Sequence, residues 1–344
     1  MEDFLIMRLA NGFMSTYVLY ISCELKIFDQ LEKQRKNIVQ LSGILNINSD
    51  SLLRILRPLV SYGIISRDCN ENYYLEKFGE RLVSSNENSL WKYVLFCGRE
   101  GMKKWQMLYP AMMEKNNLFS EKEDFNIFTG QKDNKEKFQV FDGMMETSSR
   151  NVNLENFLKE YMDKDRAVHI ADVGGGTGTI LFKFLKYYTK SIGTILDLHF
   201  VEEKAKKNIL KNGLEKRCFF KQSDFFCNLN IKAEVFVLSR VLHDWEDRKA
   251  LLILENISKC MSYNSDLIII EEIMPETNEK GALEVYLNDL QMWAFCNGRE
   301  RTEKEFNHLL EVVGLELNKS IYIQRGGYLA ILIAKKRKMI EGFI

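Results

Sequence analysis

In the C-terminal two thirds of the chain, short apolar runs alternate with longer segments whose apolar residues recur at helical spacing. Short apolar runs bounded by turn residues are typical of buried strands. Five runs and a closing hairpin around Arg325-Gly326-Gly327 are expected, at residues 168–173, 193–197, 218–220, 235–238 and 267–270, then 320–324 and 328–333. This alternation predicts an α/β fold with a Rossmann-like, mostly parallel sheet that helices cover on both faces.

The first part of the chain has a different, mainly helical pattern. The expected elements are helices at residues 4–31, 37–43 and 52–60 and a hairpin at 64–67 and 73–75. Ser49-Asp50-Ser51 supplies capping residues for the third helix. Helices followed by a hairpin form a winged-helix pattern, so we divide the chain into a winged-helix domain at 1–115 and an α/β domain at 116–344. Residues 116–164 are a helical connection within the second domain.

A winged helix raises the question of DNA binding. Its second helix carries only Arg54 and Arg57 beside many apolar residues, whereas a DNA reader presents a more basic face. The 48 Lys and Arg residues of the chain balance 48 Asp and Glu residues, which gives no electrostatic case for nucleic acid or an anionic membrane. The helices from Phe4 to Phe28 and from Leu52 to Val60 carry more apolar surface than one small domain covers. We therefore expect a homodimer that binds no nucleic acid.

The cysteines and the N-terminus bear on the cellular compartment. Seven cysteines are scattered and never form a C-x-x-C pair, which favours reduced thiols and no zinc ribbon. The chain starts with the acidic sequence Met1-Glu2-Asp3, and we expect no apolar run that approaches the length of a membrane span. These features predict a cytoplasmic protein without a membrane partner.

A glycine-rich loop, Asp172-Val173-Gly174-Gly175-Gly176-Thr177-Gly178, follows the first strand and precedes a helical pattern at 180–185. A strand, a glycine turn and a helix in this order form a nucleotide-type site. A dinucleotide fingerprint needs glycine at position 179, which is Thr179, and no P-loop lysine follows. The loop therefore suits a ligand that approaches Gly174 and Gly176 closely but has no pyrophosphate. S-adenosylmethionine fits this description.

Further candidate residues follow the next strands of the predicted sheet. Asp197 ends the second strand, where it can accept hydrogen bonds from ribose hydroxyls or cap a helix. Asp224 follows the third strand and can accept from an adenine amino group beside Phe225, or be an ordinary loop acid. His243, after the fourth strand, titrates near neutrality and can accept a hydroxyl proton, although a lone histidine is more often structural. We assign no role to the other histidines, His169, His199 and His308.

Three motifs together resemble one family. Asp172–Gly178, Arg240–Trp245 and Gly298–Thr302 are similar, in order and spacing, to motifs of S-adenosylmethionine-dependent O-methyltransferases of the caffeate and acetylserotonin type. Residues 20–83 resemble the winged-helix dimerisation domain of that family, so the likeness covers nearly the whole chain.

The resemblance implies roles for individual residues. It makes His243 the general base, with Glu271 and Glu300 on either side to orient the ring and stabilise its protonated form. Met292, Met145 and Asp244 are implied in the acceptor pocket, with core packing as the alternative for both methionines. The implied partners of the cofactor carboxylate are Ser239 or Arg240, with Arg150 as a further candidate.

Two local features qualify these roles. His199 stands where the family usually has proline, so the turn after Asp197 can differ. Thr302-Glu303-Lys304-Glu305 is a capping box, which predicts a helix that begins just after Glu300.

The sequence thus predicts an O-methyltransferase that moves the methyl group of S-adenosylmethionine to a hydroxyl of a small, aromatic, natural-product-like molecule. No metal is expected, because no compact carboxylate cluster stands out along the chain. Two alternatives remain open. One is a member of the family adapted to N- or C-methylation or to a non-methylating rearrangement. The other is a winged-helix regulator that senses a small ligand.

Overall fold

The computed structural model describes residues 2–113, 135–279, 281–323 and 327–337. Contacts divide the chain into two compact units. The first contains Met1–Tyr109 and Gln131–Ser148, and the second contains Pro110–Gly130 and Ser149–Ile344.

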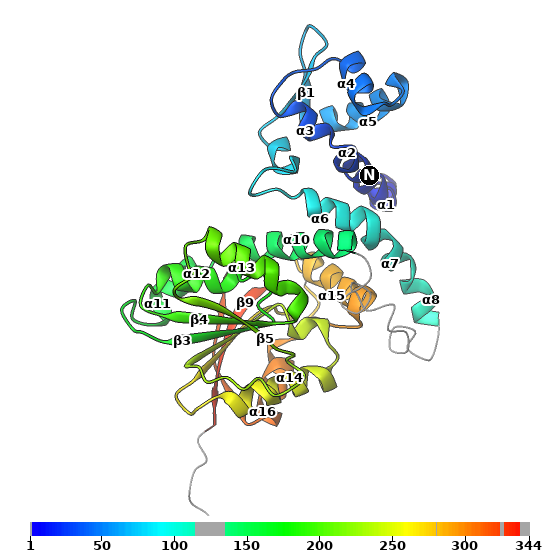
Figure 1. Cartoon of the computed structure of the whole chain (residues 1–344). Helices are drawn as coiled ribbons and strands as arrows, with labels where there is room; N and C mark the ends of the chain where they lie inside the picture. Colours follow the sequence, from blue (N-terminus) through cyan, green and yellow to red (C-terminus); the bar gives the residue numbers. More distant parts are fainter. Residues whose placement is uncertain (1, 114–134, 280, 324–326, 338–344) are drawn as a thin grey trace, which may run out of the picture. The chain divides into compact units, whose positions relative to one another are not determined.

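The first unit is mainly helical with one small hairpin (Figure 1). Its elements are α1 (Glu2–Ala10), α2 (Gly12–Glu24), α3 (Ile27–Leu31), α4 (Ile38–Leu45), α5 (Ser49–Ser61), β1 (Ile65–Arg67), β2 (Tyr73–Leu75), α6 (Trp91–Phe96) and α7 (Met102–Gln106). Two further helices, α8 (Leu108–Met113) and α10 (Lys135–Asn151), each have residues in both units. The antiparallel pairing of Ile65 with Leu75 and of Arg67 with Tyr73 confirms the expected hairpin.

The start of α5 differs from the expected cap. Asn48, rather than the serines that follow it, accepts hydrogen bonds from the backbone N–H groups of Asp50 and Ser51. Ser49 is already helical. An asparagine side chain reaches the N2 and N3 amides of the first turn as well as serine does, so the helix begins one residue after it.

An N-terminal stretch, Asp3–Glu24, corrects one expectation. Its 22 residues are long and apolar enough to cross a membrane, with a mean hydropathy of 1.3, and they form the one helical stretch of the described residues that meets this test. The sequence expectation of no such run was wrong, because Asp3, Arg8 and Glu24 interrupt a segment whose average is still apolar. Phe4 and Leu9 are 68% and 69% exposed, so the chain itself leaves this apolar surface uncovered.

The second unit is built on a seven-stranded sheet with the order β5-β4-β3-β6-β7-β9-β8. Its strands are β3 (His169–Val173), β4 (Ile192–Asp197), β5 (Cys218–Gln222), β6 (Val235–Ser239), β7 (Asp266–Glu272), β8 (Leu315–Tyr322) and β9 (Leu329–Lys336). The first five strands are parallel, and β9 and β8 are added antiparallel. This confirms the predicted mostly parallel sheet and its closing hairpin, although Arg325 and Gly326 of the turn lie outside the described residues.

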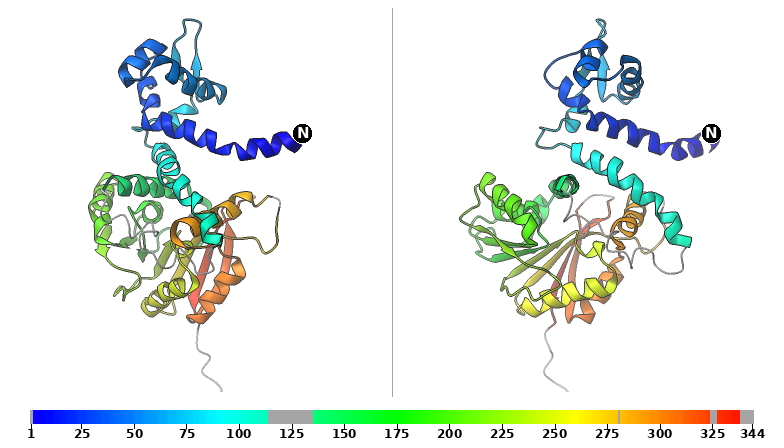
Figure 2. Two further views of the ribbon diagram at one scale, coloured as in Figure 1. Left: turned by 90° about the vertical axis from the view of Figure 1, so that its right-hand side faces the viewer. Right: turned by 45° about the vertical axis from the view of Figure 1, so that its right-hand side comes forward.

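Helices cover both faces of this sheet (Figures 1 and 2). They are α11 (Glu155–Tyr161), α12 (Thr179–Tyr187) and α13 (Glu202–Lys211) on one face, and α14 (Asp247–Cys260) and α16 (Glu303–Val312) on the other, with α15 (Leu283–Cys296) between β7 and α16 in sequence. Alternate residues of β6 divide between the two cores: Val235 and Val237 pack with α12, while Phe236 and Leu238 pack with α14. A strand buried on both faces has no polar alternation, which is why the sequence shows it as a continuous apolar run.

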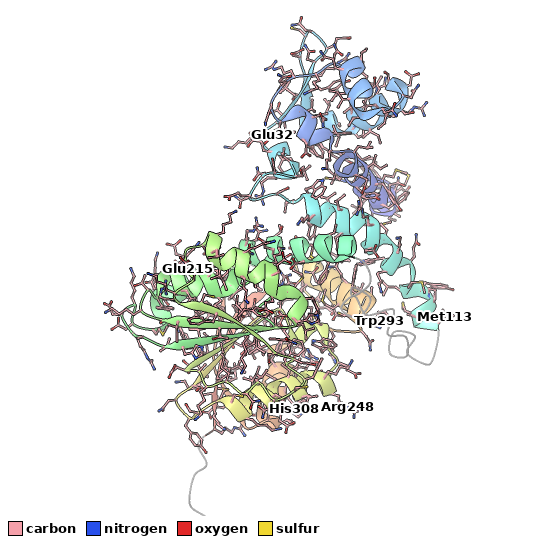
Figure 3. All side chains as sticks on the ribbon, in the orientation of Figure 1. Glu32, Met113, Glu215, Arg248, Trp293 and His308 are labelled. Carbon is pink, nitrogen blue, oxygen red and sulfur yellow. The ribbon has the colours of Figure 1, made fainter. Side chains whose placement is uncertain are left out.

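Parallel strands place their following loops along one edge of the sheet, and ligands of open α/β sheets bind at that edge. Many of the residues singled out from the sequence stand at this edge, at the ends of β4, β6 and β7 or in the loops after β3, β5 and β6, whereas Met292 lies on α15 and Glu300 in the loop after it. His308 does not belong to this edge: it is exposed on α16, on the outside of the helix layer, as is Arg248 on α14 (Figure 3).

Candidate active site

The glycine loop after β3 needs three of its glycines for backbone reasons. Gly174, Gly176 and Gly178 have φ angles of +69°, +54° and +86°, a region that residues other than glycine rarely occupy. A Cβ atom at Gly174 would also lie 2.9 Å from a methyl group of Val241 and 3.5 Å from the ring of Phe225. The loop therefore packs tightly against Val241 and Phe225 and leads directly into the N-terminus of α12.

Asp197, at the end of β4, contacts this loop. Its Oδ2 accepts a hydrogen bond of 2.7 Å from the Gly176 N–H, and its Oδ1 accepts one of 2.7 Å from the Leu198 N–H. The first contact brings the carboxylate to the glycine loop, as a ribose-binding role requires. The second is a local contact with the next residue and not a helix cap, because Leu198 is the N-cap of the following turn and no side chain bonds there. The ribose role stays a prediction.

The loop after β5 brings Phe225 to the same place, while Asp224 is exposed and accepts from the Phe226 N–H at 2.9 Å. The Phe225 ring packs edge-on to Trp245, with ring centroids 6.1 Å apart. Asn256, a buried residue of α14, donates to the Phe225 carbonyl at 3.0 Å. Sequence reasoning did not single out Asn256, because its partner is 31 residues away in the chain.

Asp172 is a second residue whose position the sequence did not reveal. Its side chain is 1% exposed beneath the loop, and its Oδ2 has no hydrogen-bond partner among the described residues. Burial, and after it the charge of Asp197, raises the pKa of this carboxyl to about 7.

His243 lies in a short 3₁₀ turn, Leu242–Asp244, directly after β6. Its Nδ1 is 2.9 Å from Glu300 Oε1 and 3.5 Å from Glu271 Oε2, whereas its Nε2 is 3.6 Å from Asp244 Oδ1. The side chains of His243, Glu271 and Glu300 are nearly inaccessible to solvent. The structure thus brings together the histidine and all three acids named from the sequence, with both glutamates at the same ring nitrogen.

Each glutamate is held by backbone or side-chain contacts of its own. Glu271, at the end of β7, accepts from the N–H groups of Val241 and Leu242 through Oε1, at 3.0 and 2.9 Å. The Glu300 N–H donates to Asp289 Oδ1 at 2.8 Å, which fixes the loop on which Glu300 stands. Asp289 belongs to α15, three residues before Met292, and the sequence analysis assigned it no role.

Glycine at position 298 lets this loop approach the histidine. A Cβ atom there would lie 2.0 Å from the His243 carbonyl oxygen. The same carbonyl accepts from the Arg299 N–H at 2.8 Å. The capping box expected after Glu300 is present, with Thr302 and Glu305 bonded reciprocally at the start of α16.

The acids control the charge of the imidazole. Burial lowers the pKa of His243, but Glu271, Glu300 and Asp244 outweigh it and raise that pKa to about 10. Burial raises the pKa of Glu271 to about 7 and that of Asp244 to about 6, although the neighbouring imidazolium opposes both shifts. Three carboxyl groups around one imidazole therefore favour its protonated form.

The same cluster bears on the metal question. One donor atom each from His243, Glu271 and Glu300 lies within 4.8 Å of the others. The expectation of no metal rested on the absence of a compact carboxylate cluster, and that premise was wrong, because the two glutamates are distant in sequence. Independence of a metal stays a prediction.

The remaining candidates are placed less directly. Ser239, at the end of β6, has an Oγ without a partner among the described residues, and Arg240 follows it with a φ of +57°. Arg150 is exposed, and its carbonyl accepts from Lys183 Nζ at 2.9 Å. Met292 is half-buried on α15. Met145 belongs to the first unit, so the structure gives it no position relative to His243.

A glycine loop, an acidic residue at the end of the next strand and a buried histidine after the fourth define a class I methyltransferase site on this sheet. Residues 105–316 match the model of the O-methyltransferase domain, and residues 7–85 match that of the O-methyltransferase dimerisation domain. The chain belongs to the O-methyltransferase family. It is an S-adenosylmethionine-dependent O-methyltransferase, as the resemblance of its motifs implied.

Named relatives match over almost the full length. The chain is 24% identical over 315 residues to the phenazine O-methyltransferase of Lysobacter antibioticus, which covers 92% of this chain and 91% of the relative. It is 26% identical over 323 residues to the acetylserotonin O-methyltransferase of Bos taurus, with 90% and 91% covered. The crystal structure of human N-acetylserotonin methyltransferase in complex with S-adenosylmethionine has the same fold, with a TM-score of 0.86, 24% identity and 98% of each chain covered.

Proposed function

We propose that this enzyme methylates a hydroxyl of a small aromatic, natural-product-like molecule and uses His243 as the general base. The observation that carries the proposal is the asymmetric surrounding of the imidazole. Two buried glutamates lie at Nδ1, so a neutral ring keeps its hydrogen there and its lone pair on Nε2. A hydroxyl within reach of Nε2 can give up its proton to that lone pair.

The cofactor supplies an electrophilic methyl group on a sulfonium, which is already a good leaving group. The residues of the chain therefore have two tasks, to align the acceptor oxygen and to take its proton. Glu271 and Glu300 hold the ring in one orientation and stabilise the imidazolium that results. The buried carboxylates make His243 a stronger base than an ordinary histidine, because they raise its pKa.

The loop residues fit S-adenosylmethionine on grounds of their own. Gly174 and Gly176 keep the loop free of side chains where a ligand can approach, and Asp197 offers carboxylate oxygens for the ribose. Ser239 Oγ is a buried polar atom without a partner among the described residues, which suits a cofactor carboxylate. We assign Arg240 and Arg150 to the same carboxylate, and Asp224 and Phe225 to the adenine.

The acceptor pocket is proposed to include Asp244, Met292 and Met145. Asp244 is partly buried beside Nε2, on the side of the ring where an acceptor hydroxyl must lie. An aromatic acceptor is supported by the names of the relatives, which act on a phenazine and on acetylserotonin. Aromatic rings pack favourably against methionine sulfur.

We further propose a homodimer formed through the dimerisation domain, with residues 1–115 as the dimerising part and 116–344 as the catalytic part. The match at residues 7–85 and the exposed apolar surface of α1 and α2 support it. In this arrangement the N-terminal helices complete the acceptor pocket of the partner.

Two alternatives can be separated from this proposal by experiment. An enzyme adapted to N- or C-methylation would not need a base with raised pKa, and a ligand-sensing regulator would not need turnover. Purified enzyme should transfer label from methyl-labelled S-adenosylmethionine to members of a panel of phenols and hydroxyquinones. Transfer only to matched anilines would favour N-methylation, and a gel shift with DNA without turnover would favour the regulator.

A further inference from the structure

Arg301 is the largest fully buried side chain of the described residues, and no role has been assigned to it above. It follows Glu300 directly in the Gly298–Thr302 motif. Burying a guanidinium is costly unless its N–H groups are hydrogen-bonded. The partners of Arg301 therefore indicate which part of the structure this side chain holds in place.

Those partners surround the turn that carries His243. Arg301 Nη1 donates to the Leu242 carbonyl at 2.8 Å, and Nη2 donates to the Trp245 carbonyl at 2.7 Å. These two carbonyls stand immediately before and after the His243–Asp244 pair. Nε and Nη2 also donate to Asp247 Oδ1, at 2.9 and 2.8 Å, in the first turn of α14. The rigid fork of the guanidinium thus spans the whole turn.

The turn is held from its other side by Glu271, which accepts from the N–H groups of Val241 and Leu242. A carboxylate therefore holds the amides that enter the turn, and a guanidinium holds the carbonyls around the histidine. Glu300 contacts the imidazole ring, and Arg301 bonds the carbonyls of Leu242 and Trp245 on either side of the His243–Asp244 pair. One segment therefore sets both the ring and the turn that carries it. That segment is itself fixed, because the Arg301 carbonyl accepts from the Met274 N–H at 2.9 Å.

We infer that Arg301 is a positioning residue for methyl transfer: it holds the 242–245 turn so that Nε2 of His243 faces the acceptor hydroxyl. The inference rests on the proposed role of His243 as the base. Lysine keeps the charge at this position but has one nitrogen instead of a planar fork, so it cannot bridge Leu242, Trp245 and Asp247 together. Small misplacements of a reacting group cost about 10- to 100-fold in rate.

The test compares Arg301→Lys with Arg217→Lys in the full-length enzyme. Arg217 is a matched control, because it also donates to backbone carbonyls, those of Leu185 and Ser191, but beside the first residues of β4, away from the site. We expect Arg301→Lys to lower kcat for an un-ionised phenol about 10- to 100-fold with S-adenosylmethionine affinity unchanged. Arg217→Lys should lower the melting temperature and leave kcat within about twofold.

A double-mutant cycle with His243→Ala separates positioning from general damage. If Arg301 acts through His243, adding Arg301→Lys to His243→Ala should lower the residual rate by less than about twofold. Equal losses in both backgrounds, or no loss in either, overturn the inference. An undiminished rate in His243→Ala alone counts against the proposed base, which is a different result.

If Arg301→Lys does not fold, a second variant, Asp247→Asn, tests the inference instead. The Asp247 side chain is 55% exposed, so Asp247→Asn should fold while it weakens the contact that fixes Nε and Nη2. We expect a several-fold loss of kcat that disappears in the His243→Ala background. The inference is refuted if Arg301→Lys fails to fold and Asp247→Asn folds with full kcat. Arg301 would then be a purely structural residue.

Discussion

The Nδ1 atom of His243 lies 2.9 Å from Glu300 Oε1, although the two residues are 57 positions apart in the chain. This contact, with Glu271 Oε2 at 3.5 Å from the same atom, determines which ring nitrogen can do chemistry. A nitrogen that faces carboxylates carries the hydrogen, so the proton-accepting lone pair of the neutral ring is on Nε2. The position of the two glutamates therefore predicts a base with a defined tautomer.

Removal of this base should affect turnover and not cofactor binding. His243→Ala is expected to lower kcat about 10²–10⁴-fold for an un-ionised phenol and to leave S-adenosylmethionine affinity nearly unchanged. An acceptor that is already ionised at the assay pH has no proton to lose, so its rate should fall much less. Single-turnover rates with both acceptors make the comparison. Equal losses for the two acceptors would contradict the general-base role.

The pH dependence of the reaction follows from the carboxylates around the ring. Because Glu271 and Glu300 outweigh the effect of burial and raise the pKa of His243 to about 10, the neutral base becomes more abundant as the pH rises towards that value. We expect kcat/KM for an un-ionised acceptor to keep rising above neutral pH. Glu271→Gln removes one negative charge, so the rise should move to lower pH. A profile that stays in place after this substitution argues that another group titrates.

The sequence predicted the features that are local in the chain. The five parallel strands are continuous apolar runs because both their faces are buried, and the glycine loop is recognised by its own spacing. The beginning of β8 at Leu315 was missed, since Leu315 is its one buried residue and the rest of the strand is a partly exposed edge without an apolar run.

The unpredicted site residues have partners far away in the sequence. Arg301 contacts a carbonyl 59 residues earlier, and Asn256 contacts one 31 residues earlier. Asn256 carries no local pattern that distinguishes it from other polar residues of a helix. Arg301 lies in the Gly298–Thr302 motif, but nothing in that motif shows which groups its side chain contacts. Only the packing of the sheet and its helices brings them to the site, so an unaligned sequence could not identify them.

Cofactor affinity should depend on Asp197. Asp197→Ala is expected to weaken S-adenosylmethionine binding by roughly 1–3 kcal/mol, because the ribose hydroxyls lose an acceptor and the Gly176 N–H loses its partner. Asp197→Asn keeps one oxygen for Gly176, so it should retain part of the affinity. Calorimetry measures both. Unchanged affinity in the alanine variant would remove Asp197 from the site.

The exposed apolar surface of α1 predicts a dimer. Leu9 is 69% exposed, and a charge placed there would be buried if a second copy covers this helix. Sedimentation at micromolar concentration should give a dimer for the parent enzyme and a smaller species for Leu9→Glu. Leu210→Glu, an equally exposed leucine at 65% on α13 of the catalytic unit, is the matched control and should stay dimeric. A monomeric parent enzyme would count against the proposed homodimer.

The buried carboxyl of Asp172 predicts a pH-dependent cost of folding without cofactor. Burial raises its pKa to about 7 from an ordinary value of 3.8, so the folded protein binds more protons than the unfolded chain between these two pH values. The free energy of unfolding contributed by this group therefore falls as the pH rises from about 4 to about 7. Asp172→Asn keeps an oxygen that can accept a hydrogen bond and removes the charge. At pH 8 it should stabilise the cofactor-free enzyme by at least about 1 kcal/mol, which is less than the free energy that corresponds to a pKa shift of one unit.

At pH 4.5 the same substitution should have a clearly smaller effect on the free energy of unfolding than at pH 8. This pH lies less than one unit above the ordinary pKa of 3.8, so only the first part of the fall in stability has occurred there. Urea unfolding at both pH values measures the difference. Asp197→Asn at the same two pH values is the comparison, since the charge of Asp197 is the second cause of the raised pKa at Asp172 and its removal should stabilise the fold in the same direction. A destabilised Asp172→Asn at pH 8 would mean that the fold stabilises the ionised carboxylate, contrary to this reasoning.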